Sequence, residues 1–263
     1  MAEEEVKIPL YVKGAPIIGG VHIGLIAVLI AIKLAAAAIP TFPVPGLPGA
    51  LSAAGFLRGL TGPLMGPIGG FVVGLVFGVL AQTIWAHTAF FGPFTFLTNV
   101  AGSSVEGLVL YPKKKGWIIA EIYFIVMLLL WYFYKGGAGL VGGMPIVTWE
   151  HWFAIILLGL PWTRKLMQDA IIKRDDPKKL FIGIWFIGWI GAMGNNIMGN
   201  VLAFYMWDFT NPIYWVPMTG YYAVIDVLYS TVAAIVVSAI LISLKRANIR
   251  SFVDELIPSP LEQ

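Results

Sequence analysis

The sequence predicts an all-α fold, a polytopic bundle of six to eight transmembrane helices with both termini in the cytoplasm. Of its 263 residues, 59% are hydrophobic and 12% are charged, whereas a soluble globular domain has about 25% charged residues. The mean hydropathy is +0.84. The longest polar stretch, residues 163–179, is too short to form a core of its own. We therefore expect residues 1–263 to form a single integral domain of the cell membrane.

Apolar segments of about 17–25 residues are candidate membrane spans. Strong candidates lie at 16–39, 66–90, 116–134, 180–206 and 217–243. Weaker candidates lie at 49–63, 94–111 and 144–162. Acidic residues precede the first span, unlike the basic start of a cleaved signal peptide, so residues 1–15 are predicted to form a cytoplasmic tail. Residues 244–263 form the second cytoplasmic tail in this prediction.

Basic residues gather in three clusters along the chain. They lie at 113–115, 164–179 and 245–250, and the intervening connections at 40–48, 135–143 and 208–216 hold only Lys135. Because basic clusters mark the cytoplasmic side, both ends lie inside and the number of crossings is even. Eight spans satisfy this condition, and so do six if the 49–63 segment and one other are re-entrant or lie on the surface.

The connection TFPVPGLPGA, residues 41–50, follows the first span on the predicted outer side. Three prolines and two glycines exclude a helix here. Two interpretations stay open, a cover over a pocket and a rigid turn between two helices.

Small residues recur every fourth position on two predicted helices, which lets helix backbones approach closely in lipid. The positions are Gly66, Gly70, Gly74 and Gly78 on one helix, and Gly20, Gly24, Ala27, Ala31 and Ala35 on the other. A single ladder is typical of packing within one bundle. Two ladders on separate helices favour a role for one of them in contacting a partner subunit.

Polar side chains inside apolar spans are costly and therefore indicate function. Asp226 shares a helical face with Tyr222 and Ser230, which lie four residues to either side. Together with other polar and aromatic groups it predicts an outer cavity for a small polar, partly aromatic molecule. The predicted substrate-binding residues are Gln82, Trp85, His87, Thr95, Asn99, Asn196, Asn200 and Asp226. The alternative is that these groups satisfy one another across helices; the single charges Lys33 and Glu106 receive no role.

Several chemistries have no signature in this sequence. No phosphate-binding G-x-x-x-x-G-K-[ST] motif occurs, so ATP-driven work would need another subunit. The chain has no cysteine, and His22, His87 and His151 follow no metal-binding pattern. We therefore predict a protein that is not an enzyme and has no metal, cofactor or nucleic-acid partner.

The order of motifs between residues 20 and 111 resembles the substrate-binding subunits, or S components, of energy-coupling-factor (ECF) transporters, and an archaeal type in particular. AVLIAIKLAAAA (27–38) is similar to the family's alanine-rich first helix, and a proline-rich outer loop follows it. LTGPLMGPIGGFVVGLVFGVLAQ (60–82) and FGPFTFLTNVAGSSVEGLVLY (91–111) resemble the next two family motifs. GNNIMGNVLAFYMW (194–207) resembles the closing helix pair of archaeal members.

The resemblance implies an ABC-type importer subunit that captures a vitamin-like or trace nutrient at the outer face. Its Ala27, Ala31 and Ala35 would contact a transmembrane scaffold subunit, and two ATPase subunits would drive uptake. A different class stays open, a non-catalytic structural or redox-associated subunit of a larger membrane complex. In that case the ten tryptophans and the WYFY run at 131–134 would serve lipid-interface anchoring and subunit contacts.

Overall fold

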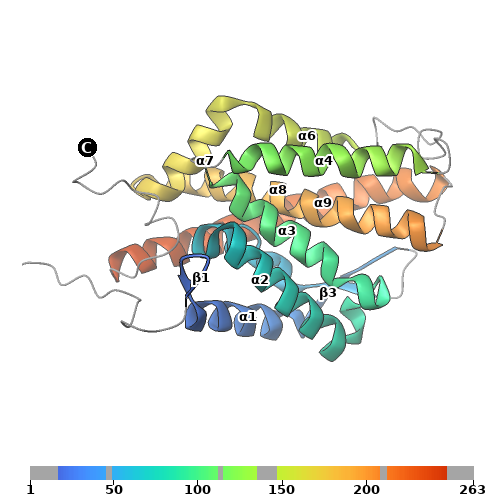
Figure 1. The fold of residues 1–263 in the computed structure, drawn as a ribbon, viewed down its shortest axis with the longest axis horizontal. Helices are drawn as coiled ribbons and strands as arrows, with labels where there is room; N and C mark the ends of the chain where they lie inside the picture. The colour runs from blue at the N-terminus through green and yellow to red at the C-terminus, as the bar shows by residue number, and fades with distance from the viewer. Residues whose placement is uncertain (1–16, 46–48, 112–114, 135–146, 208–211, 248–263) are drawn as a thin grey trace, which may run out of the picture.

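The computed structural model describes residues 17–45, 49–111, 115–134, 147–207 and 212–247, with only the helical backbone given for 212–218. These residues form eight α-helices: α1 (Ile23–Ala37), α2 (Thr61–Ile84), α3 (Phe96–Val109), α4 (Gly116–Tyr132), α6 (Trp149–Gly159), α7 (Pro161–Lys173), α8 (Pro177–Trp207) and α9 (Pro212–Arg246). The predicted helical bundle is confirmed (Figure 1).

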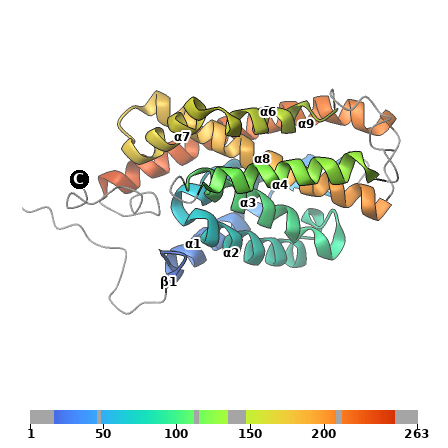
Figure 2. The same cartoon turned by 45° about the horizontal axis from the view of Figure 1, so that its top comes forward.

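Most of the helices run along the long axis of the molecule (Figures 1 and 2). Helices α1 and α2 run in the same direction, since Trp85 and His87, just past the end of α2, contact the backbone at the end of α1. The start of α1, the α7–α8 junction and the end of α9 lie at one end of the bundle. Lys245 Nζ at that end donates to the Lys173 carbonyl oxygen at 2.6 Å. Basic residues of α7, α8 and α9 therefore gather at one end, as the charge pattern predicts.

Helix lengths support a membrane protein. Among the described residues, α2, α8 and Thr219–Arg246 of α9 are long and apolar enough to cross a membrane. Two further apolar helices, α1 and α4, are shorter. The number of crossings and the side on which each terminus lies remain predictions.

Three segments differ from the predicted spans. The 66–90 segment corresponds to α2, which ends at Ile84, followed by the 3₁₀ turn η2 (Ala86–Thr88). The 16–39 segment begins with a hairpin of β1 (Ile17–Ile18) and β2 (Val21–His22) before α1 starts. The 49–63 segment is no separate helix, because it holds β4 (Ala50–Ser52), the 3₁₀ turn η1 (Ala53–Leu57) and the beginning of α2. Its Gly55 and Gly62 lie against other elements of the bundle, where a side chain would clash, and Gly59 has a φ of +72° that favours glycine. The predicted tail 1–15 lies outside the described residues, and the predicted 244–263 tail begins inside α9.

The described part of the proline-rich connection is not helical, as predicted. Strand β3 (Pro40–Pro43) pairs antiparallel with β4, and η1 follows directly. The chain then returns into the bundle, where Leu57 and Leu60 are buried. We call residues 38–60 the connecting segment; its residues 46–48 lie outside the described part of the chain.

The glycine ladder of α2 packs against the backbone of α3. A Cβ atom placed on Gly70 would lie 2.4 Å from the Ser103 carbonyl oxygen, and one on Gly74 would lie 2.6 Å from that of Asn99. Only glycine permits this approach. Gly66 differs from the other members, because its φ of 62° and ψ of −170° interrupt the helix. Pro67 then stands at the first position of the main part of α2, where its missing N–H is tolerated.

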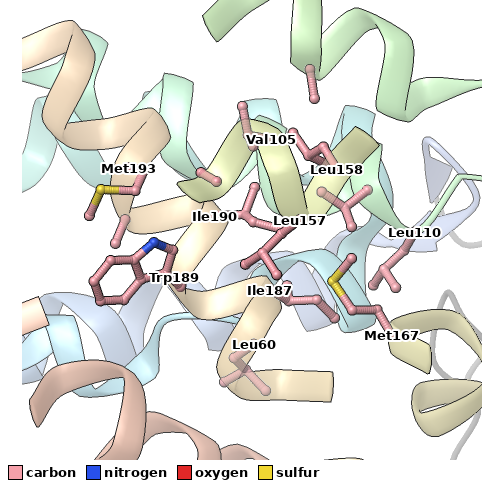
Figure 3. Close-up of a cluster of buried hydrophobic side chains, with 14 of the residues drawn as sticks. Leu60, Val105, Leu110, Leu157, Leu158, Met167, Ile187, Trp189, Ile190 and Met193 are labelled. Atoms are coloured by element: carbon pink, nitrogen blue, oxygen red, sulfur yellow. The ribbon is translucent and has the colours of Figure 1, made fainter. Parts of the chain in front are cut away.

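The apolar core lies where α3, α6, α7 and α8 meet (Figure 3). Ile187 and Ile190 of α8 are fully buried there, and Leu60 of the connecting segment joins the same cluster. At the exposed start of α8, the Asp176 carboxylate accepts the backbone N–H groups of Lys178 and Lys179. These amides, that of Lys179 first, hold the pKa of Asp176 below its usual range.

Candidate binding site

A cavity of about 120 Å³ lies between α1, α2, α3, α8, α9 and the connecting segment. This volume is below the roughly 300–1,000 Å³ typical of sites for drug-sized ligands. Its charged and polar walls are formed by Lys33, Ser52, Arg58, Thr88, Thr95, Thr98, Asn99, Ser103, Glu106, Asn195, Asn196 and Tyr229. Its apolar walls include Leu51, Phe77, Ala81 and Phe90. The bundle thus contains a partly open polar site with room for a small molecule.

An ion pair anchors the connecting segment beside the cavity. The Arg58 guanidinium donates to the carboxylate of Asp226 in α9, which is 1% exposed. Asn196 Nδ2 donates to the other carboxylate oxygen at 2.7 Å. Because each Asp226 oxygen has a charged or polar donor, the pair is stable in an apolar surrounding.

Tyr229 of α9 holds the same segment from a second side. Its hydroxyl is hydrogen-bonded to Thr41 and donates to the Ser52 carbonyl oxygen at 3.0 Å. The Arg58 guanidinium lies 4.6 Å from the centre of the Tyr229 ring, within cation–π range. Gly55 allows this packing, because a Cβ there would lie 2.8 Å from the ring.

Glu106 of α3 binds the backbone at the point where the connecting segment leads into α2. Its Oε1 accepts the Gly59 N–H at 2.9 Å, and its Oε2 accepts the Gly62 N–H at 3.3 Å. A carboxylate at the beginning of a helix is favourable, since it complements the free N–H groups of the first turn. Both Glu106 oxygens are therefore occupied by protein donors.

Lys33 of α1 carries a buried ammonium group into the cavity. The residue is 8% exposed, and Nζ donates to Thr61 Oγ1 at 3.3 Å. Nζ also lies 5.1 Å from the centre of the Phe77 ring. Glu106 attracts Lys33 electrostatically, but no carboxylate of the described residues forms an ion pair with it.

Four of the predicted substrate-binding residues lie at or next to the cavity. Thr95, Asn99 and Asn196 line it, and Asp226 lies directly behind Arg58. The Thr95 hydroxyl also accepts the Phe91 N–H at 2.8 Å and donates to the Gly92 carbonyl oxygen. In the described part of the chain, the side-chain amides of Asn99 and Asn195 make no hydrogen bond.

The other four predicted residues do not line the cavity. Gln82 donates to the Pro93 carbonyl oxygen and accepts the Phe96 N–H, so it joins α2 to the start of α3. Trp85 Nε1 donates to the Leu34 carbonyl oxygen at 3.2 Å, and His87 Nε2 lies 3.1 Å from that of Ala37. These contacts tie the end of α2 and the turn that follows it to α1. Asn200 lies one helical turn beyond Asn196 on α8.

The predicted partner-binding residues face outward. Ala27, Ala31 and Ala35 are all exposed along one side of α1. The opposite face of that helix, with Ile26, Leu29 and Lys33, is buried. The alanines thus lie on a surface that this chain leaves uncovered.

Sequence reasoning missed the charged residues that define the site. Lys33 and Glu106 received no role, and Arg58 was not singled out. The available signal was their isolation, since each is a single charge within an otherwise apolar segment. These three side chains meet at one cavity only because the connecting segment returns into the bundle. The pattern of apolar residues does not predict that return.

The described residues contain no group of three or more histidine, aspartate and glutamate side chains that could hold a metal ion. Comparison of the chain with family models, with curated proteins and with solved structures finds no match.

Proposed function

We propose that the protein is the substrate-binding membrane subunit of an ECF-type importer, which captures a small nutrient for uptake driven by ATPase subunits. The observation that carries the proposal is the polar cavity of about 120 Å³ inside an apolar helical bundle. Buried polar groups are costly in such a bundle, so a cavity lined by several of them suits a polar solute.

The exposed side of α1 supports the proposed contact with a partner subunit. Small side chains at Ala27, Ala31 and Ala35 would let a second helix approach closely, as small residues do between membrane helices. The cavity lies on the other side of α1, where Lys33 points inward. Substrate binding and partner docking would therefore use opposite faces of one helix.

Affinity purification from the native membrane tests this function. The tagged chain should bring with it a scaffold membrane subunit and an ATPase pair. Ala31→Trp should abolish this association, because the indole would hold the scaffold helix away. Ile122→Trp is the matched control, since Ile122 is 55% exposed on α4, away from the alanine stripe. Recovery with haem-containing or respiratory subunits instead, or full association of Ala31→Trp, would overturn the proposal.

A further inference from the structure

We propose that the cavity takes a small organic monocarboxylate, with the carboxylate group bound by the Lys33 ammonium. The proposal rests on the proposed function for its biological meaning, but it is argued from the charges and hydrogen bonds of the cavity itself.

The acidic groups at the cavity are already satisfied. Each oxygen of Glu106 accepts a backbone N–H, and each oxygen of Asp226 accepts a side-chain donor. A cationic ligand would have to compete with these protein donors. The carboxylates thus organise the connecting segment and do not present an open site for a cation.

The basic groups at the cavity, Lys33 and Arg58, have N–H donors that the protein does not use. An ammonium group has three N–H donors and a guanidinium has five. Lys33 donates to one neutral hydroxyl, Thr61 Oγ1, and Arg58 donates to Asp226. A buried ammonium without an ion-pair partner is unfavourable, and an incoming anion removes that cost. The cavity therefore has a surplus of donors centred on Lys33.

The walls around Lys33 suit an organic body. Phe77 and Phe90 line the cavity, and the free amides of Asn99 and Asn195 add neutral polar contacts. The volume of about 120 Å³ limits the ligand to a small molecule. A short aliphatic or single-ring acid satisfies both conditions, whereas an inorganic anion would leave the aromatic walls without contacts.

The test compares carboxylates with amides of the same shape on the purified full-length chain. Thermal stability and native mass spectrometry would be measured with acetate, butyrate and benzoate, each beside acetamide, butyramide and benzamide, and with sulfate. We expect at least one carboxylate to raise the melting temperature and its amide to have little effect. Equal effects of acid and amide, a response to sulfate alone, or no response to any carboxylate would overturn the proposal.

Lysine variants locate the binding group. Lys33→Met should weaken carboxylate binding by about tenfold or more, the loss expected for a charge-assisted hydrogen bond of about 1.5–3 kcal/mol. Lys33→Arg should retain the preference for the acid, and Lys245→Met, at the exposed end of the bundle, should leave it unchanged. Unaltered affinity in Lys33→Met would contradict the assignment. Association with the scaffold and ATPase subunits is a separate measurement, so failure here would not be mistaken for failure of the proposed function.

Discussion

At the scale of residues, the site depends on the arrangement of four charges, of which Lys33, Glu106 and Asp226 are buried and Arg58 is partly buried. Asp226 pairs with Arg58. Neither Glu106 nor Lys33 has an ion-pair partner among the described residues, but each Glu106 oxygen accepts a backbone N–H, whereas Lys33 donates to a single neutral hydroxyl. The two carboxylates have mainly a positioning role, since they hold the connecting segment against α3 and α9. The ammonium is the group available to a ligand.

The Arg58–Asp226 pair gives a prediction at this scale. Removing one partner leaves an uncompensated buried charge, so Asp226→Leu and Arg58→Met should each lower the free energy of unfolding by about 3–5 kcal/mol. The double variant should recover most of that loss, because no charge is then left unpaired. Chemical denaturation of the four proteins in detergent would measure the coupling. Strictly additive losses would show that the two side chains do not act as a pair.

At the scale of elements, the closest contact is that between α2 and α3. The ladder at Gly70, Gly74 and Gly78 brings the α2 backbone against that of α3 without intervening side chains. The Gln82 side chain fixes the register of the two helices at their shared connection. Thr95, which directly precedes α3, and Thr98 and Asn99 within α3 owe their place at the cavity to this register.

The same glycine-to-alanine substitution at two positions, one at the α2–α3 contact and one on an exposed surface, tests that contact. Gly74→Ala should destabilise the protein by about 1–3 kcal/mol, the usual cost of overpacking, since its Cβ would lie 2.6 Å from the Asn99 carbonyl oxygen. Gly220→Ala in α9 should stabilise the protein, because nothing lies within 4 Å of its Cβ position and alanine favours a helix. Melting temperatures in detergent would measure both, and a neutral Gly74→Ala would mean that the helices separate at no cost.

The sequence was most informative about the helices, and less so about the segments that connect them and about the site. Long apolar runs predict the existence of α2, α8 and α9, because each is a long hydrophobic helix. The bounds of α2 are less well predicted, since the 66–90 run begins and ends five to six residues later than the helix. The connecting segment was harder, since the run at 49–63 has the composition of a span but lacks the length. At the site, four-residue spacing grouped Asn196 with Asn200, and of the two only Asn196 lines the cavity. Gln82 and Trp85 bind nearby backbone carbonyls that no spacing rule identifies.

At the scale of the whole molecule, described basic residues gather at one end of the bundle, where Lys245 donates to the Lys173 backbone. The connection between α2 and α3, which contains the 49% exposed Phe94, lies at the other end (Figure 1). Basic residues favour the cytoplasmic side. The two ends are therefore expected to face opposite sides of the membrane.

Cysteine labelling tests this orientation directly, because the native chain contains no cysteine. In intact cells, a membrane-impermeant maleimide should label Phe94→Cys and leave Lys173→Cys and Lys245→Cys unlabelled. In inverted vesicles the pattern should reverse. Labelling of Phe94→Cys and Lys245→Cys from the same side would refute the orientation.

The connecting segment also has a consequence for biosynthesis. Arg58 and its partner Asp226 are 168 residues apart in the chain. At a synthesis rate of about 5–20 residues per second, Asp226 is made roughly 8–34 s after Arg58. During that interval the guanidinium lacks its partner carboxylate on α9. The segment can take its final position only after the last helix has been made, so completion of the site is expected to be a late step in assembly.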